Sequence, residues 1–161
     1  MDHYLLWKTL HVFSATILMG TGIGIAFFCW FGSRAAIRAN NIGAIRVVLR
    51  FTVLADALFI APAVVIQFAT GALLLDANGW SWQSSWSMTG VALFAFVGAC
   101  WLPVVWIQSR LKKFANAASE IELLPAAFTK LFRVWFLLGI PAFAAMIALV
   151  YLMIAKPLAV T

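Results

Sequence analysis

The chain has 161 residues, of which 65% are hydrophobic and only 10% carry a charged side chain. A soluble domain of this length needs more charge on its surface, so the composition excludes that class and indicates an integral membrane protein. A net charge of +6 is also typical of nucleic-acid-binding proteins. However, all the basic residues except Lys8 and Lys156 fall in two clusters between apolar runs, which instead favours a signal for orientation in a membrane.

Four apolar runs alternate with these charged segments. They cover residues 5–31, 51–75, 88–108 and 131–155, so each is 21 to 27 residues long. A helix of about 20 residues crosses a bilayer core of ~30 Å. The sequence therefore predicts an all-α bundle of four transmembrane helices, in one domain that covers residues 1–161.

The two basic clusters predict how the helices are oriented. One holds Arg34, Arg38, Arg46 and Arg50, and the other holds Arg110, Lys112, Lys113, Lys130 and Arg133. The positive-inside rule places both clusters in the cytoplasm, so both termini are expected outside. The same charges are expected to contact anionic lipid head groups.

The second basic connection, residues 109–128, is long enough for a short helix lying on the membrane. Its apolar residues recur at near-helical spacing and are Leu111, Phe114, Ala118 and Ile121, ahead of Pro125. This spacing predicts an amphipathic surface helix between the third and fourth spans.

The first apolar run contains a histidine, His11, which lies about 9 Å below its outer end at ~1.5 Å per residue. An ionisable group at this depth is costly and usually marks a functional site. The alternative is a neutral imidazole that is hydrogen-bonded inside the bundle. The second run offers partners for that role, because Gln67 is expected at nearly the same depth and Thr70 lies one turn away.

The opposite face of the same run carries only small side chains, at Thr16, Gly20 and Gly24. Such a small-xxx-small pattern lets two membrane helices approach closely. It predicts contact with a neighbouring helix, either within the bundle or in a homodimer.

A metal centre at His11 would most easily be a b-type haem. Zinc and copper sites usually need three or four ligands, and the only other histidine, His3, lies at the membrane edge. Haem needs one or two axial ligands and a large apolar slot. Met146 is expected at a comparable depth on the fourth span and is the candidate second ligand, although a membrane methionine usually only packs. Copper binding through Cys100 and Met19 is a third alternative.

The second apolar run carries a polar stripe that must point into the bundle. Its members are Thr52, Asp56, Gln67 and Thr70. We expect Asp56 to form a structural ion pair with Arg133 or Arg34. The functional alternative is a proton relay from the cytoplasm through Asp56 toward His11. Pro62 is expected to kink this helix, since it has no N–H to donate.

The outer hairpin turns at Asn78-Gly79 and then presents three tryptophans, Trp80, Trp82 and Trp86. Tryptophans are enriched at the membrane surface, so an aromatic belt accounts for them. The alternative is that they wall the entrance for a quinone or a porphyrin.

The opening segment, residues 5–22 with Lys8 and His11, resembles the bacterial family called domain of unknown function 2269. The surroundings of Asp56 and the stretch from Pro62 to Gly71 resemble the same family, so the similarity covers most of the chain. The family is similar to CopD-like copper-resistance membrane proteins and to HemJ-type protoporphyrinogen oxidases. The HemJ-type haem-associated histidine maps onto His11. Because this chain lacks the further histidines of those relatives, the resemblance implies haem binding rather than copper chemistry or porphyrinogen oxidation.

The leading hypothesis is therefore a small multi-pass protein of the bacterial inner membrane that binds haem b. His11, Met146 and Gln67 would contact the haem, for electron transfer with a redox partner or for haem handling. The alternative is a non-catalytic membrane subunit or transporter component with a structural polar core. Copper handling ranks third. The sequence contains no nucleotide-binding loop and no nucleophile–base pair, so it identifies no catalytic residues and leaves the question of enzymatic activity open.

Overall fold

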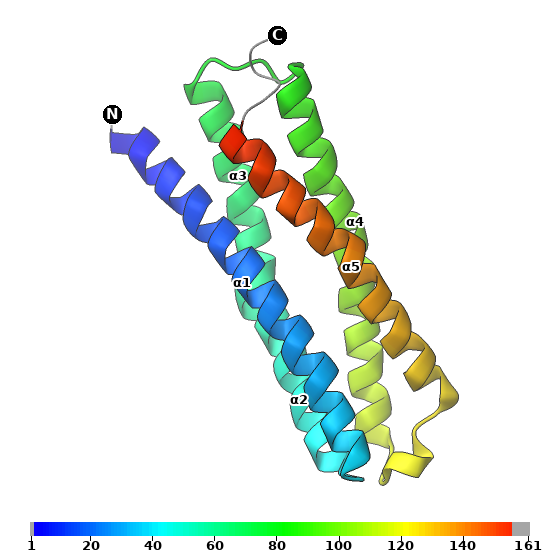
Figure 1. The fold of residues 1–161 in the computed structure, drawn as a ribbon. Helices are drawn as coiled ribbons and strands as arrows, with labels where there is room; N and C mark the ends of the chain where they lie inside the picture. Colours follow the sequence, from blue (N-terminus) through cyan, green and yellow to red (C-terminus); the bar gives the residue numbers. More distant parts are fainter. Residues whose placement is uncertain (1, 156–161) are drawn as a thin grey trace.

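The computed structural model describes residues 2–155, and Figure 1 shows them as long helices packed side by side. The elements in chain order are α1 (Asp2–Arg38), α2 (Ile42–Ala55), the π-helix η1 (Asp56–Ile60), α3 (Ala61–Ala77), α4 (Ser85–Ala117), the 3-10 helix η2 (Ile121–Leu123) and α5 (Ala126–Ala155). Because α2, η1 and α3 follow one another without a break, the described residues form four rods. Each rod is long and apolar enough to cross a membrane, which confirms the predicted four-helix bundle.

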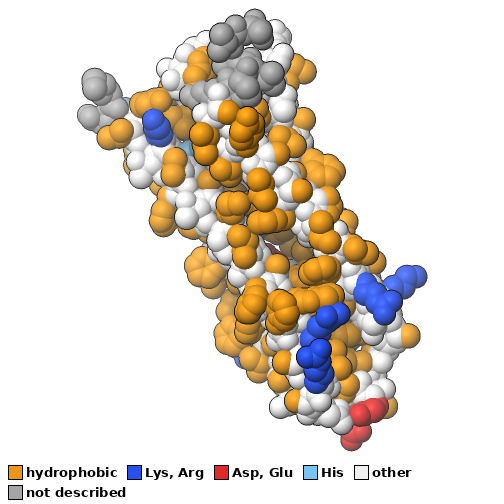
Figure 2. Space-filling view, viewed as in Figure 1, with side chains coloured by type: hydrophobic (Ala, Val, Ile, Leu, Met, Phe, Trp, Pro, Cys, Tyr) orange, Lys and Arg blue, Asp and Glu red, His pale blue; other side chains and the backbone are white. Residues whose placement is uncertain are grey.

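The helices extend beyond the apolar runs, most clearly at the end of the molecule where Lys and Arg gather (Figure 2). An apolar run marks only the part of a helix that lies in hydrocarbon, whereas backbone hydrogen bonds continue into the polar interface. At this end α1 ends at Arg38, and Asn40 in the following turn has a left-handed φ of 48°. Asn41 then caps α2, because its side-chain oxygen accepts a hydrogen bond from the Ala44 N–H at 2.9 Å. We call this end, with the α1–α2 and α4–α5 connections, the basic end, and the opposite one the hairpin end.

The predicted surface helix in residues 109–128 was wrong. The structure instead continues α4 to Ala117, and only the single turn η2 follows before α5. The apolar spacing belongs to α4, since Leu111 and Ala115 are fully buried in the core of the bundle. Arg46 of α2 fastens this end of α4 by donating to the carbonyl oxygens of Ala115 and Ala118, at 3.0 and 2.6 Å.

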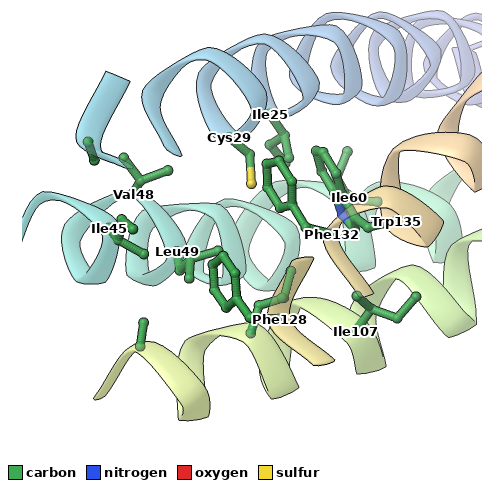
Figure 3. Packing of buried hydrophobic residues seen from close by; sticks show 13 residues of the cluster. Ile25, Cys29, Ile45, Val48, Leu49, Ile60, Ile107, Phe128, Phe132 and Trp135 are labelled. Carbon is green, nitrogen blue, oxygen red and sulfur yellow. The ribbon is translucent and has the colours of Figure 1, made fainter. Parts of the chain in front are cut away.

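The main hydrophobic core lies in the half of the bundle toward the basic end (Figure 3). Its members come from all four rods and include Cys29, Leu49, Ile60, Ile107, Phe128 and Trp135. Here α1 packs against α5. The Trp30 ring of α1 stacks on Phe132 and Phe136 of α5, with centroid distances of 5.3 and 4.0 Å. Toward the hairpin end, α1 lies along α3 and α5 lies along α4.

The disturbance predicted at Pro62 takes the form of a π-helix just before the proline. The N–H of Ala61, directly after η1, donates to the carbonyl of Asp56, five residues earlier. Proline has no N–H and so cannot bond the carbonyl of Leu58, which favours a widened turn at this position. Asp56 is therefore the first residue of the widened turn.

Candidate functional site

His11 of α1 is the centre of a hydrogen-bond network with α3. Its Nδ1 lies 3.0 Å from Thr70 Oγ1, and its Nε2 lies 3.0 Å from Gln67 Nε2. Ser14, one turn along α1, donates to Gln67 Oε1 at 2.5 Å. Both predicted partners are confirmed, and the four side chains, here called the His11 network, join α1 to α3.

The hydrogen-bond partners of His11 show which of its two ring nitrogens carries the proton. The Thr70 hydroxyl donates its hydrogen to the Ile66 carbonyl at 2.6 Å, so its oxygen must accept from the Nδ1–H of His11. The unprotonated Nε2 then accepts from the amide of Gln67. His11 is thus a neutral imidazole with both ring nitrogens bound, although its ring is only half-buried.

A glycine on α3 provides the space for this ring. A Cβ at Gly71 would lie 3.2 Å from Cε1 of His11, which is tighter than nine in ten real Cβ contacts. With any other residue at this position, the imidazole would have to shift by a few tenths of an ångström. The Thr70-Gly71 pair thus supplies a hydrogen-bond acceptor and a close approach at the same point.

A haem or other metal would have to compete for this histidine. Thr70 holds the Nδ1–H, which is the arrangement that orients metal-binding histidines. The ligating atom would then be Nε2, but Gln67 occupies it. The residues therefore fit haem iron only if the Gln67 amide moves away. Met146 is half-buried on α5, and no hydrogen bond or ring contact links it to the His11 network, so its role as a second ligand stays a prediction.

The copper alternative gains no support from the site. Within residues 2–155, no group of three or more His, Cys, Asp and Glu side chains is placed to hold a metal ion. Cys100 is buried, and His3 is exposed near the start of α1.

The ion pair predicted for Asp56 was wrong. The guanidinium of Arg34 lies over the Trp30 ring, 4.0 Å from its centroid, and Arg133 is exposed on α5. The carboxyl of Asp56 faces Gln108 and Trp101 of α4 instead. Long basic side chains near helix ends reach more favourable surroundings at the interface, so they leave the buried carboxyl without a cation.

Asp56 and five other side chains in the same half of the bundle each keep a buried polar atom without a hydrogen-bond partner in the described part of the chain. The atoms are Ser33 Oγ, Thr52 Oγ1, Asp56 Oδ2, Trp101 Nε1, Gln108 Oε1 and Trp135 Nε1. We call these six residues the Asp56 cluster. Sequence analysis identified only Thr52 and Asp56 among them. A glutamine in an apolar span was the available signal for Gln108, but only packing shows which residue it faces.

The small-residue face of α1 is open in this chain. A Cβ at Gly20 or Gly24 would meet nothing within 4 Å, and Thr16 is exposed beside them. The alternative of packing within the bundle is therefore excluded for these two glycines. Their contact with a second copy stays a prediction.

The three hairpin tryptophans do not act as one belt. Trp86 is buried, and its indole donates to the Leu152 carbonyl of α5 at 3.0 Å. Trp80 packs edge-on against Trp86 with centroids 5.0 Å apart. Only Trp82 is exposed, and it donates to Asp76 at 3.1 Å. Trp86 thus serves to hold α4 and α5 together.

Comparison with known proteins agrees with this architecture. A family model described as "predicted integral membrane protein (DUF2269)" matches residues 5–157. No curated protein and no solved structure matches the chain. The wider grouping with CopD-like and HemJ-type proteins therefore stays a prediction. A match over nearly the whole length, together with four membrane-spanning helices, shows that the chain belongs to the DUF2269 family of multi-pass integral membrane proteins.

Proposed function

We propose that this protein is a non-catalytic membrane subunit or transporter component in which the His11 network fastens α1 to α3. The observation that carries the proposal is that α3 side chains bind both ring nitrogens of His11. A nitrogen that accepts a hydrogen bond from Gln67 has no lone pair left for a metal or for accepting a proton from a substrate.

The hydrogen bonds of the His11 network offset the free-energy cost of placing polar groups at this depth in the membrane. Buried donors and acceptors in a membrane need partners, and those on neighbouring helices contribute about 0.6–2 kcal/mol per interaction. Here His11, Gln67 and Thr70 satisfy one another in a single chain of hydrogen bonds. Gly71 brings the two helices close enough for these bonds to form.

A double-mutant cycle tests this proposal. His11→Ala and Gln67→Ala are each expected to lower thermal stability in detergent, and the double variant is expected to lose less than the sum of the two. The expected coupling free energy is about 0.6–2 kcal/mol. His3→Ala is the matched control, because that histidine is exposed. Additive effects of His11→Ala and Gln67→Ala would contradict a structural network.

Binding of b-type haem is the second candidate function, and one observation favours it. Thr70 fixes the Nδ1–H tautomer, which points Nε2 at any incoming ligand once Gln67 turns aside. When bound, haem would supply one-electron chemistry or be the cargo itself. The measurement is the absorption spectrum of protein purified from haem-replete cells, for the wild type and for His11→Ala and His3→Ala.

A Soret band that is lost in His11→Ala and kept in His3→Ala would establish this second function. Gln67→Leu would then bind haem more tightly than the wild type, since the competing amide is gone. A colourless wild type that stays colourless after haem addition would leave the structural role alone.

A further inference from the structure

The Asp56 cluster is the one part of the described chain where buried side-chain nitrogen and oxygen atoms lack partners. Native proteins leave few such atoms, and each one needs an explanation. Here six of them occur in the same half of the bundle, on all four rods. Their grouping indicates a common cause rather than isolated packing defects.

Contacts connect the members across helices. The thiol of Cys29 on α1 lies against the hydroxyl groups of Ser33 and Thr52 and near the carboxyl of Asp56. The carboxyl in turn faces Gln108 and Trp101 of α4. Cys29 and Trp135 of α5 belong to the same core cluster, into which both point in Figure 3. Polar side chains from α1, α2, η1 and α4 therefore lie together within an otherwise apolar core.

The charge of Asp56 has no counterpart in this core. Its side chain is 6% exposed, and the described residues of α1, α4 and α5 place no Lys, Arg or His against it. Cys29 is the one other titratable side chain that faces it. An unpaired carboxylate in hydrocarbon is costly, so the carboxyl needs one positive charge from outside the chain.

The six atoms without hydrogen-bond partners also indicate which kind of ligand suits the site. Four are oxygens, from one carboxyl, one amide and two hydroxyl groups. Oxygen atoms of these kinds bind protons and hard cations, whereas soft metals prefer sulfur and imidazole. A single carboxyl matches a single positive charge rather than a divalent ion. The two indole N–H groups of Trp101 and Trp135 can donate to the carboxyl but cannot bind a cation.

The backbone adds a feature that suits an exchangeable ligand. Asp56 begins the π-helix η1, and π-turns inside helices occur frequently at functional sites. Pro62 has no N–H to donate to the Leu58 carbonyl, so the regular α-helical hydrogen-bond pattern is interrupted next to Asp56.

From these observations, we propose that the Asp56 cluster binds one exchangeable monovalent cation, either a proton or an ion of the size of Na⁺. The Asp56 carboxyl supplies the charge, and Gln108, Thr52 and Ser33 supply the neutral oxygens. The site is separate from the His11 network. It gives a transporter component a charge that can bind and leave within the membrane.

Carbodiimide labelling of the purified wild type tests the proposal. Dicyclohexylcarbodiimide modifies protonated carboxyl groups in apolar surroundings, and mass spectrometry locates the modified residue. We expect labelling of Asp56 to rise as the pH falls from 9 to 6. If the ligand is a metal cation, Na⁺ will suppress the labelling and choline will not; if it is a proton, neither will. Exposed Asp76 is the internal control and is expected to label weakly throughout.

Thermal unfolding in detergent provides a second measurement that does not depend on access of the reagent. A cation that binds only the folded protein, at about ten times its Kd, raises Tm by roughly 3–6 °C in a chain of this size. The wild type should show such a rise with Na⁺ or with falling pH, and Asp56→Asn should not, whereas Asp76→Asn should respond as the wild type. If neither labelling nor Tm of the wild type depends on pH or on cations, the proposal is overturned.

Discussion

The two polar regions of this bundle differ in how completely their atoms are paired. In the His11 network, each ring nitrogen and the amide of Gln67 have partners on the facing helix. In the Asp56 cluster, the carboxyl and the amide of Gln108 each keep an orphaned oxygen although they are more deeply buried. A fully paired network stabilises one arrangement of helices, whereas a partly paired one costs stability until a ligand completes it. The comparison therefore separates a structural region from a candidate binding region.

Leucine substitutions in the two regions are expected to have opposite effects, and these are the largest that we predict. His11→Leu removes the partner of both Gln67 and Thr70 and should lower the free energy of unfolding by about 1–3 kcal/mol. Asp56→Leu removes an unpaired charge from hydrocarbon and should leave stability unchanged or raise it when no ligand cation is present. Chemical or thermal unfolding in choline buffer measures both. A strong loss of stability in Asp56→Leu would show that its carboxyl is already satisfied by the protein.

The glycine beneath the imidazole gives a finer test of the His11 network. Gly71→Ala places a Cβ 3.2 Å from His11 Cε1 and should destabilise the protein by about 1 kcal/mol, at the lower end of overpacking effects. Gly20→Ala is the matched control on the open face of α1 and should cost almost nothing. Thermal unfolding compares the two variants. Equal values of Tm would mean that the ring moves aside freely, and the close approach at Gly71 would then not matter.

Substitutions of the hairpin tryptophans should show the smallest difference in stability. Trp86→Phe loses a buried hydrogen bond to the Leu152 carbonyl, which is expected to cost about 0.5–1.5 kcal/mol. Trp82→Phe loses an exposed hydrogen bond to Asp76 and should change stability by less than about 0.5 kcal/mol. Unfolding followed by tryptophan fluorescence measures both variants. If Trp82→Phe is the more damaging, the tryptophans act mainly through the hairpin surface rather than through the contact between α4 and α5.

The sequence by itself determined the four spans, the pairing of His11 with Gln67 and Thr70, and the turn at Gly79, which has a positive φ of 65°. These features follow from local rules: apolar length, depth counted along a helix, and the freedom of glycine. Only the tertiary structure decided that Asp56 lacks a cation and faces Gln108 and Trp101, that residues 109–117 extend α4, and that Trp86 is buried. Each of these depends on how the helices are rotated about their axes and which rods pack together. That is set by the summed packing of many side chains, such as Trp30 on Phe132 and Phe136, and no single residue's spacing reveals it.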